Sequence, residues 1–350
     1  MILGIESSCD DSALALFEPE KGVTGHWMSS QATLHEKYGG VVPDLASREH
    51  LSNLPAMLAL LREPLAGRTP EAIYYTAGPG LAPCLAMGKT LAQALATPWQ
   101  CPIFGVNHLR AHAYSPFIDY FAKDPAAFPR EVRKLLPHLG LLVSGGNTVM
   151  YRIPAIGQIE ILAETRDDAA GEAIDKGAKL LGLPYPGGPH IERLASEGDR
   201  NFYSFPIGQN RQKDLFFSFS GLKTSLRYYL EAHSEEEVRQ NLTDLCAAYQ
   251  EAVVQGLVLR LKESLKRTQD VASVGLCGGV AQNGRLREVL GALVSDSGRP
   301  FLVARKEFCG DNAAMIALAG FLEKAFLVKN APIRPSLTLP EHPLPKEVCR

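Results

Sequence analysis

The sequence has no long hydrophobic run, no closely paired cysteines and almost no net charge. No apolar stretch approaches the ~20 residues that a membrane-spanning helix needs. The seven cysteines are odd in number and form no CxxC pair, which argues against a disulfide framework or a cysteine-rich zinc site. The formal net charge is -2, so a nucleic-acid partner would need a local basic patch or a helper subunit. The opening MILGIESSCDD lacks the basic start of a secretory signal, and we expect a cytoplasmic protein without a membrane contact.

The 350 residues alternate short apolar runs with helical patterns, which predicts an α/β fold of about two domains. Apolar runs at 2–5 and 13–17 flank a small polar loop, and this pattern predicts a β-hairpin rather than the strand-turn-helix of a Rossmann unit. Runs at 139–143 and 149–153 flank a second such loop. The two halves therefore share one plan, although they share little sequence.

Three glycine-containing turns, at 4–11, 143–148 and 276–283, are candidates for phosphate binding. Small residues let backbone N–H groups approach and cradle a phosphate. The alternative for each turn is a bend that only glycine fits. Gly88-Lys89-Thr90 matches the end of a P-loop, but Pro83 stands where that loop needs glycine, so we reject a Walker A site.

His108 and His112 are four residues apart, so in a helix both imidazoles would lie on one face and could share a metal ion. Leu109 stands where a zinc peptidase carries its catalytic glutamate, which leaves a peptidase without its base. Asp311, at a predicted helix start, is a candidate third ligand. The alternatives are a satisfied or solvated histidine pair and an aspartate that caps a helix.

A helix predicted around 168–181 carries Asp168, Glu172 and Asp175 on one face. This face is either a solvated acidic surface or a place where Asp175 binds a hydroxyl or amine of a ligand. Gly188 follows at the start of another helix, where the backbone could touch a ribose.

Taken together, ten segments resemble the TsaD family, the tRNA N6-adenosine threonylcarbamoyltransferases, formerly described as O-sialoglycoprotein endopeptidases. The resemblance runs from Ile2 to about Ala319 and is highly specific. The segments are GIESSCDD, YGGVVPDLASREH, YTAGPGL, NHLRAH, LLVSGGNT, DDAAGEAIDK, YPGGP, FSFSGLKT, GGVAQN and CGDNAAM.

The resemblance implies the two-lobed fold of actin, Hsp70 and sugar kinases (the ASKHA fold), built from duplicated ribonuclease-H-like domains. We expect an N-terminal actin-like lobe at 1–134 with the histidine ligands and a C-terminal lobe at 135–330 with the nucleotide site. The last helix of the second lobe can pack back on the first. Residues 331–350, rich in proline, form an extended tail.

The resemblance also implies the reaction: the threonylcarbamoyl group moves from threonylcarbamoyl-AMP to N6 of adenosine 37, in tRNAs that read codons beginning with A, and AMP is released. One divalent metal ion, Fe2+ or Zn2+, held by His108, His112 and Asp311, would polarise the carbamoyl carbonyl. Ser7, Ser8 and Asp10 match the family's first phosphate-type loop. Donor contacts, to threonylcarbamoyl-AMP or to ATP or AMP, carry over to Leu142, Val143, Ser144, Gly145, Gly146, Asp175, Gly188, Glu192 and Asn283.

The family's partners are tRNA, a paralogous actin-fold subunit (TsaB-like) and a small ATPase (TsaE-like). Four basic residues cluster in the sequence and could meet phosphates, although a solvated charged surface is the commoner explanation. They are Arg211, Lys213, Lys223 and Arg227.

AMP is a good leaving group, so this transfer needs no covalent intermediate, and either Asp10 or Asp11 could accept the N6 proton. Asn107 and Asn147 depart from the pattern that the resemblance implies, which often has histidine at both places; neither is an expected metal ligand. A metallopeptidase, a non-catalytic nucleotide-binding scaffold with the actin fold and a carbamoyltransferase for a small metabolite remain as alternatives.

Overall fold

The computed structural model describes residues 1–208 and 215–344, which form two compact units. Unit 1 comprises Met1–Leu136, Ile153–Glu160 and Val303–Arg350, and unit 2 comprises Pro137–Arg152 and Ile161–Leu302. By these contacts, the last helix of the chain belongs to unit 1. Arg211 and Lys213 of the basic cluster lie outside the described residues.

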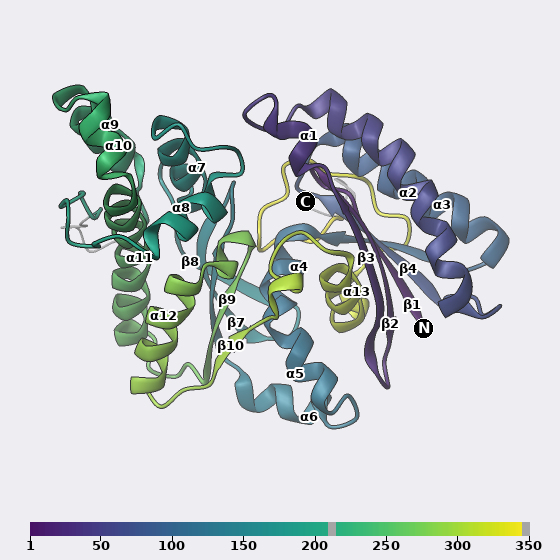
Figure 1. Cartoon of the computed structure of the whole chain (residues 1–350). Helices are drawn as coiled ribbons and strands as arrows, with labels where there is room; N and C mark the ends of the chain where they lie inside the picture. Colours follow the sequence, from purple (N-terminus) through teal and green to yellow (C-terminus); the bar gives the residue numbers. More distant parts are fainter. Residues whose placement is uncertain (209–214, 345–350) are drawn as a thin grey trace. The chain divides into compact units, whose positions relative to one another are not determined.

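Unit 1 is built on a five-stranded sheet in the order β3-β2-β1-β4-β5 (Figure 1). Strands β1 and β2 form the predicted hairpin, with Ile2 opposite Phe17, while β4 and β5 run parallel to β1. The strands are β1 (Ile2–Glu6), β2 (Asp11–Glu18), β3 (Gly22–Ser30), β4 (Ala72–Gly78) and β5 (Ile103–Asn107).

Helices cover both faces of this sheet because successive strand residues point to opposite sides. Leu3 and Ile5 are buried in a core with α2 (Pro43–Leu65) and α3 (Ala82–Trp99). Gly4, between them, faces α13 (Ala313–Leu322), and a Cβ there would collide with the Ala313 carbonyl. Figure 1 shows α13 on the face opposite α2 and α3. The remaining helices of unit 1 are α1 (Ala32–Glu36), α4 (His108–Tyr114), α5 (Ile118–Lys123) and α6 (Phe128–Glu131), with 3₁₀ turns at Ser115–Phe117, Val132–Leu135, Lys306–Phe308 and Lys324–Phe326.

Unit 2 contains a second five-stranded sheet, in the order β10-β9-β6-β7-β8. Read in the opposite direction, this order is β8-β7-β6-β9-β10, so the first to fifth strands of each sheet follow the same spatial order as β3-β2-β1-β4-β5. The duplication inferred from the shared plan is therefore confirmed. The strands are β6 (His138–Val143), β7 (Thr148–Ala155), β8 (Gln158–Glu164), β9 (Ser273–Cys277) and β10 (Phe301–Val303). The helices are α7 (Ala170–Leu180), α8 (Gly187–Ala195), α9 (Ser220–Ala232), α10 (Glu235–Gln240), α11 (Leu242–Arg267) and α12 (Gly284–Asp296), with a 3₁₀ turn at Gly279–Gln282.

Two interpretations of the sequence meet the structure directly. Gly88 is buried inside α3, against the Ser7 hydroxyl, so the rejected P-loop match is indeed no loop. Residues 119–136 belong to unit 1, where Phe121 and Phe128 are buried. Within the described residues, none of the helices combines the length and apolar character that crossing a bilayer requires.

Candidate active site

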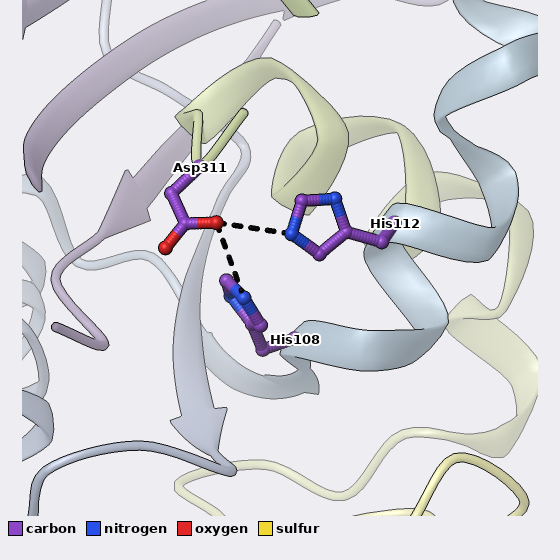
Figure 2. Close-up of side chains that lie close together, drawn as sticks. All are labelled: His108, His112 and Asp311. Carbon is purple, nitrogen blue, oxygen red and sulfur yellow. Dashed lines mark hydrogen bonds and ion pairs between the residues drawn. The ribbon is translucent and has the colours of Figure 1, made fainter. Parts of the chain in front are cut away.

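Helix α4 presents both histidines in the spacing that the sequence predicted. Asn107 caps the helix, because its Oδ1 accepts from the N–H groups of Leu109 (2.9 Å) and Arg110 (3.3 Å). His108 and His112 are both buried, and their ring centroids lie 4.6 Å apart. Figure 2 shows the two imidazoles pointing toward the same carboxylate.

That carboxylate is Asp311, which lies just before α13. The helix cap is the next residue: Asn312 Oδ1 accepts from Met315 N–H at 2.8 Å. Asp311 is therefore not the residue that caps the helix. Its Oδ1 lies 3.0 Å from His112 Nε2 and 3.4 Å from His108 Nε2 (Figure 2). The structure brings Asp311 to the two histidines, from which it is separated by about two hundred residues in the sequence.

These three groups fit a divalent cation. One ligand atom from each lies within 4.8 Å of the other two. Ligands about 2.0–2.2 Å from a tetrahedral ion are separated by roughly 3.3–3.6 Å, close to the 3.4 Å between Asp311 Oδ1 and His108 Nε2 and longer than the 3.0 Å to His112 Nε2. Two imidazoles and a carboxylate suit zinc or iron. The second nitrogen of His112, Nδ1, is buried and has no hydrogen-bond partner among the described residues.

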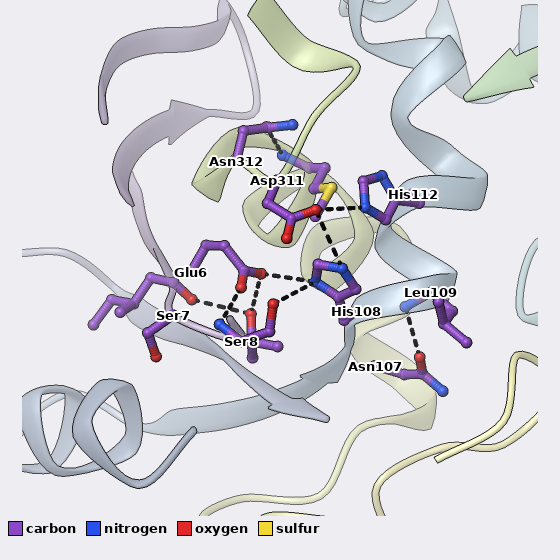
Figure 3. Close-up of polar contacts among 12 residues, drawn as sticks. Glu6, Ser7, Ser8, Asn107, His108, Leu109, His112, Asp311 and Asn312 are labelled. Atoms are coloured by element: carbon purple, nitrogen blue, oxygen red, sulfur yellow. Dashed lines mark hydrogen bonds and ion pairs between the residues drawn. The ribbon is translucent and has the colours of Figure 1, made fainter. Parts of the chain in front are cut away.

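A fourth side chain, Glu6, contacts His108 at Nδ1, while Asp311 lies near the other ring nitrogen, Nε2. Glu6 is completely buried at the end of β1, and its Oε2 accepts from His108 Nδ1 at 3.1 Å (Figure 3). Thr76 and the backbone N–H of Ser8 also donate to this carboxylate. Sequence reasoning placed Glu6 in a polar loop and missed it. The available signal was a carboxylate that directly continues a buried strand.

The electrostatics follow from two carboxylates around one imidazole. Burial alone would lower the pKa of His108, but Asp311 and Glu6 outweigh it and hold that pKa well above its usual value. The pKa of Asp311 is depressed by the two histidines despite burial, and the pKa of Glu6 is lowered in the same way by His108. Burial lowers the pKa of His112.

Asp11, at the start of β2, is a third carboxylate of unit 1 with a shifted pKa. Burial, followed by the charge of Asp311, raises its pKa to about 7. Its Oδ1 is buried and has no hydrogen-bond partner in the described part of the chain. The neighbouring Asp10 is half-buried, and its backbone carbonyl accepts from Gln31 N–H.

The first loop itself is fixed by internal contacts. Ser7 Oγ donates to the Cys84 carbonyl at 2.9 Å, and Ser8 Oγ lies 3.3 Å from His108 Nδ1. Ser7 thus has a structural partner, while Ser8 belongs to the surroundings of the histidine pair.

The residues expected to hold the donor lie in unit 2 around the ends of β6 and β9. Leu142 and Val143 are buried in β6, and Gly278 packs on the Val143 backbone. After them the chain makes a tight turn, with Ser144 N–H donating to the Asn147 carbonyl at 2.8 Å. Gly145 and Gly146 are exposed, and a Cβ on either would meet no atom within 4 Å. This turn therefore leaves open space around its two glycines.

The other expected donor contacts have local partners. Asp175 Oδ1 accepts from Gly187 N–H at 2.8 Å, and burial raises the pKa of its carboxyl. Gly188, next along, has almost open space beside it. Glu192 Oε1 accepts from Gly284 N–H at 2.7 Å. Asn283 caps α12, because its Oδ1 accepts from Leu286 N–H, and its Nδ2 donates to Gln250. Asp175, Glu192 and Asn283 each hold the start of a helix, whatever else they bind.

Comparisons with known proteins agree with this picture. The family model described as "TsaD: tRNA N6-adenosine threonylcarbamoyltransferase" matches residues 22–318. A tRNA N6-adenosine threonylcarbamoyltransferase from Anaeromyxobacter dehalogenans strain 2CP-C is 44% identical over 322 residues, covering 91% of this chain and 92% of the relative. The relative of the same name from strain 2CP-1 has the same identity and coverage.

Similar solved structures support the fold alone. HypF from T. kodakarensis matches with a TM-score of 0.56 at 15% identity, covering 93% of this chain and 48% of that one. The activator of the 2-hydroxyisocaproyl-CoA dehydratase from Clostridium difficile, with bound ADPNP, matches with a TM-score of 0.52 at 12% identity, covering 93% and 96%. Together with the two sheets of identical order, they confirm the expected two-lobed actin-like fold. By its profile match and its 44% identical relatives, the chain belongs to the TsaD family, the tRNA N6-adenosine threonylcarbamoyltransferases.

Proposed function

We propose that this chain transfers the threonylcarbamoyl group from threonylcarbamoyl-AMP to N6 of adenosine 37, in tRNAs that read codons beginning with A. The bond between the carbamoyl carbon and a phosphate oxygen of AMP breaks, and a bond between that carbon and N6 forms. AMP leaves with the oxygen, and N6 loses one proton. Family membership supports the reaction class, and the site geometry supports the division of labour among residues.

His108, His112 and Asp311 are the residues that would hold one divalent cation, Fe2+ or Zn2+. A cation bound there supplies Lewis-acid polarisation of a carbonyl oxygen, an effect of several kcal/mol in enzymes of this kind. Glu6 orients His108 through its Nδ1, as carboxylates behind metal-bound histidines commonly do. The support is the convergence of the three ligand atoms within 4.8 Å.

Asp11 is our candidate for the group that accepts the N6 proton. A general base works best when its pKa lies near the working pH, and burial raises the pKa of Asp11 to about 7. Its buried Oδ1 has no hydrogen-bond partner in the described residues. The resemblance alone did not separate Asp11 from Asp10.

For the donor we propose the turn after β6, from Leu142 to Gly146, with Asp175, Gly188, Glu192 and Asn283. The open space at Gly145 and Gly146 lets a phosphate or an oxyanion approach backbone N–H groups, and one such donor is typically worth ~3 kcal/mol in a transition state. Asp175 and Gly188 lie together at the α7–α8 junction, which suits a ribose hydroxyl.

The single observation that carries the proposal is the meeting of His108, His112 and Asp311. The test replaces the native enzyme in cells by His112→Ala or Asp311→Asn and measures modified adenosine in tRNA nucleosides by mass spectrometry. We expect loss of the modification in both, with less metal in the purified proteins. His233→Ala, a change in an exposed histidine at the end of α9, is the matched control. Normal modification by His112→Ala would reject the metal assignment.

The partners are also proposals: a paralogous actin-fold subunit of the TsaB type and a small ATPase of the TsaE type, in the cytoplasm. The alternatives are tested with purified protein. Peptide release would favour a metallopeptidase, although Leu109 at the position of the peptidase base is buried and apolar. Transfer to a small acceptor but not to stripped tRNA would favour a metabolite carbamoyltransferase, and nucleotide binding without turnover or metal would favour a scaffold.

A further inference from the structure

The chain after α13 does not leave unit 1 but crosses it. Lys329 forms an isolated antiparallel bridge with Phe104 of the edge strand β5. Further on, Arg334 N–H donates to the Ala77 carbonyl at the end of β4, at 2.6 Å. We call residues 329–341 the tail segment. It passes the carboxyl ends of β5 and β4, which are the ends that lead into α4 and the neighbouring loops.

The tail segment is a built part of unit 1. Ala331, Leu337 and Leu339 are buried, with at most 3% of each residue exposed. Gly78 has a positive φ of 143°, and a Cβ on it would occupy the place of the Arg334 backbone carbonyl. The glycine is needed there because the tail backbone lies directly against the β4 backbone.

Asn107 connects the tail segment to the helix that carries the histidines. Its Oδ1 caps α4, and its Nδ2 donates to the carbonyls of Thr338 and Glu341, both at 2.8 Å. Every polar atom of this buried side chain is thus used, and the next residue is His108.

Arg110 makes the second connection, from a position between the two histidines. It is completely buried, and its Nη1 donates to the Pro340 carbonyl at 3.0 Å. Its Nε donates to Glu323 Oε2 at 2.9 Å, and its Nη2 donates to the Gly157 carbonyl at 2.7 Å. Glu323 ends α13, the helix whose start follows Asp311. The ion pair therefore joins the two elements that carry the candidate ligands.

We propose that the tail segment, Asn107 and the Arg110–Glu323 pair form a clasp that positions α4, so that His108 and His112 stay aligned on Asp311. A helix of seven residues has little stability of its own and takes its position from its surroundings. Metal ligands stay within about 0.5 Å of their working positions only when surrounding residues hold them there. This inference rests on the proposed metal site. Asn107 and Arg110 act in it as positioning residues.

The test compares variants that weaken the clasp without leaving a buried charge unpaired. Removing Arg110 would strand Glu323 and threaten folding. Asn107→Ser keeps an oxygen that caps a helix but loses both donations to the tail segment. A chain shortened to residues 1–336 keeps the pairing with β5 and loses the part that meets Asn107. Met57→Ala is the control, since it opens the α2 core of unit 1 and leaves the clasp intact.

Two measurements are made on each protein. Hydrogen exchange of residues 107–114 is followed without metal, and Co2+ affinity is measured from the visible absorption of the bound ion. We expect faster exchange and about 10-fold weaker Co2+ binding in Asn107→Ser and in the shortened chain, within the range found for residues behind metal ligands. A peptide of residues 337–344 should restore both in the shortened chain. Met57→Ala should unfold at lower urea, with α4 exchange and Co2+ affinity unchanged.

If hydrogen exchange of residues 107–114 and Co2+ affinity were unchanged in both Asn107→Ser and the shortened chain, the proposed clasp would be overturned. Equal loss of Co2+ affinity in Met57→Ala would also overturn it, because the effect would then be one of general stability. Should the unaltered protein bind no Co2+ through His108, the proposed function fails, and the exchange rates of α4 alone decide on the clasp.

Discussion

Glu6→Gln is the substitution that tests most directly how the histidine pair works. The change keeps the shape of the side chain and removes its charge. In the native site, His108 lies between Glu6 Oε2, 3.1 Å from Nδ1, and Asp311 Oδ1, 3.4 Å from Nε2. The two carboxylates hold the pKa of His108 well above its usual value against the effect of burial. Without metal, the two carboxylates therefore favour the protonated imidazole of His108.

This protonation couples metal binding to pH. A cation that binds His108 must displace its proton, so below the pKa of His108 the affinity rises about tenfold for each unit of pH. Glu6→Gln lowers that pKa, which reduces the competition from protons. It also removes the charge that makes His108 a strong ligand, a loss of about 10–100-fold in affinity for a partner of this kind. The two effects oppose each other at low pH, whereas only the second remains at high pH.

We therefore expect Glu6→Gln to bind Zn2+ at least about tenfold more weakly at pH 8, with the difference shrinking toward pH 6. The assay is competition with a chromophoric chelator at pH 6, 7 and 8. Glu71→Gln is the matched control, because it makes the same change in charge at an exposed carboxylate whose side chain is 76% accessible. If Glu6→Gln and the native protein bound Zn2+ with the same affinity at pH 6, 7 and 8, the role of Glu6 would be refuted.

Three further predictions concern other parts of the molecule. Asp11→Asn should slow transfer about 10²–10⁴-fold and abolish the rise in rate that the unaltered enzyme shows through pH 7, as its carboxyl loses a proton; a retained rise in rates measured from pH 6 to 8 would point to another base. Phe17→Ala should cost about 3–5 kcal/mol of unfolding free energy in urea, because this buried ring packs 5.0 and 5.3 Å from Phe121 and Phe321, and a cost below 1 kcal/mol would contradict that packing. Gly145→Ala should leave the melting temperature unchanged, since a Cβ there meets no atom, but should raise KM for the donor, and an unchanged KM would remove Gly145 from the donor site.

Local patterns in the sequence were enough for much of the fold. Both hairpins and the duplicated plan follow from apolar periodicity and glycine turns. Strand β3 was not predicted. It lies at the edge of its sheet, and its sequence, GVTGHWMSS, carries few of the apolar side chains that mark a buried strand.

The site was only partly predictable for a related reason. The spacing of His108 and His112 is local, so the sequence reveals a shared face. Glu6 meets His108 across 102 residues, and Asn107 meets Thr338 across 231. Partners at such separations leave no periodic signal. The proline-rich tail segment also lacks periodicity, and side chains of other elements, such as Asn107 and Arg110, donate hydrogen bonds to its carbonyls.

For the proposed transfer, the cysteines favour direct attack of the N6 amine on the donor over a covalent intermediate on the protein. Burial raises the pKa of the Cys84 thiol to about 11 and that of Cys246 to about 12. Cys9, in the first loop, is shifted in the same direction by burial and then by the charge of Asp10. A thiol nucleophile needs a lowered pKa, so these three sulfurs are poorly suited to attack the carbamoyl carbon. In the proposed reaction the adenylate brings its own leaving group, and the tasks left to the chain are orientation, charge stabilisation and acceptance of one proton. The raised pKa values of Cys9, Cys84 and Cys246 are compatible with those tasks, because no step of the proposed reaction requires a thiolate.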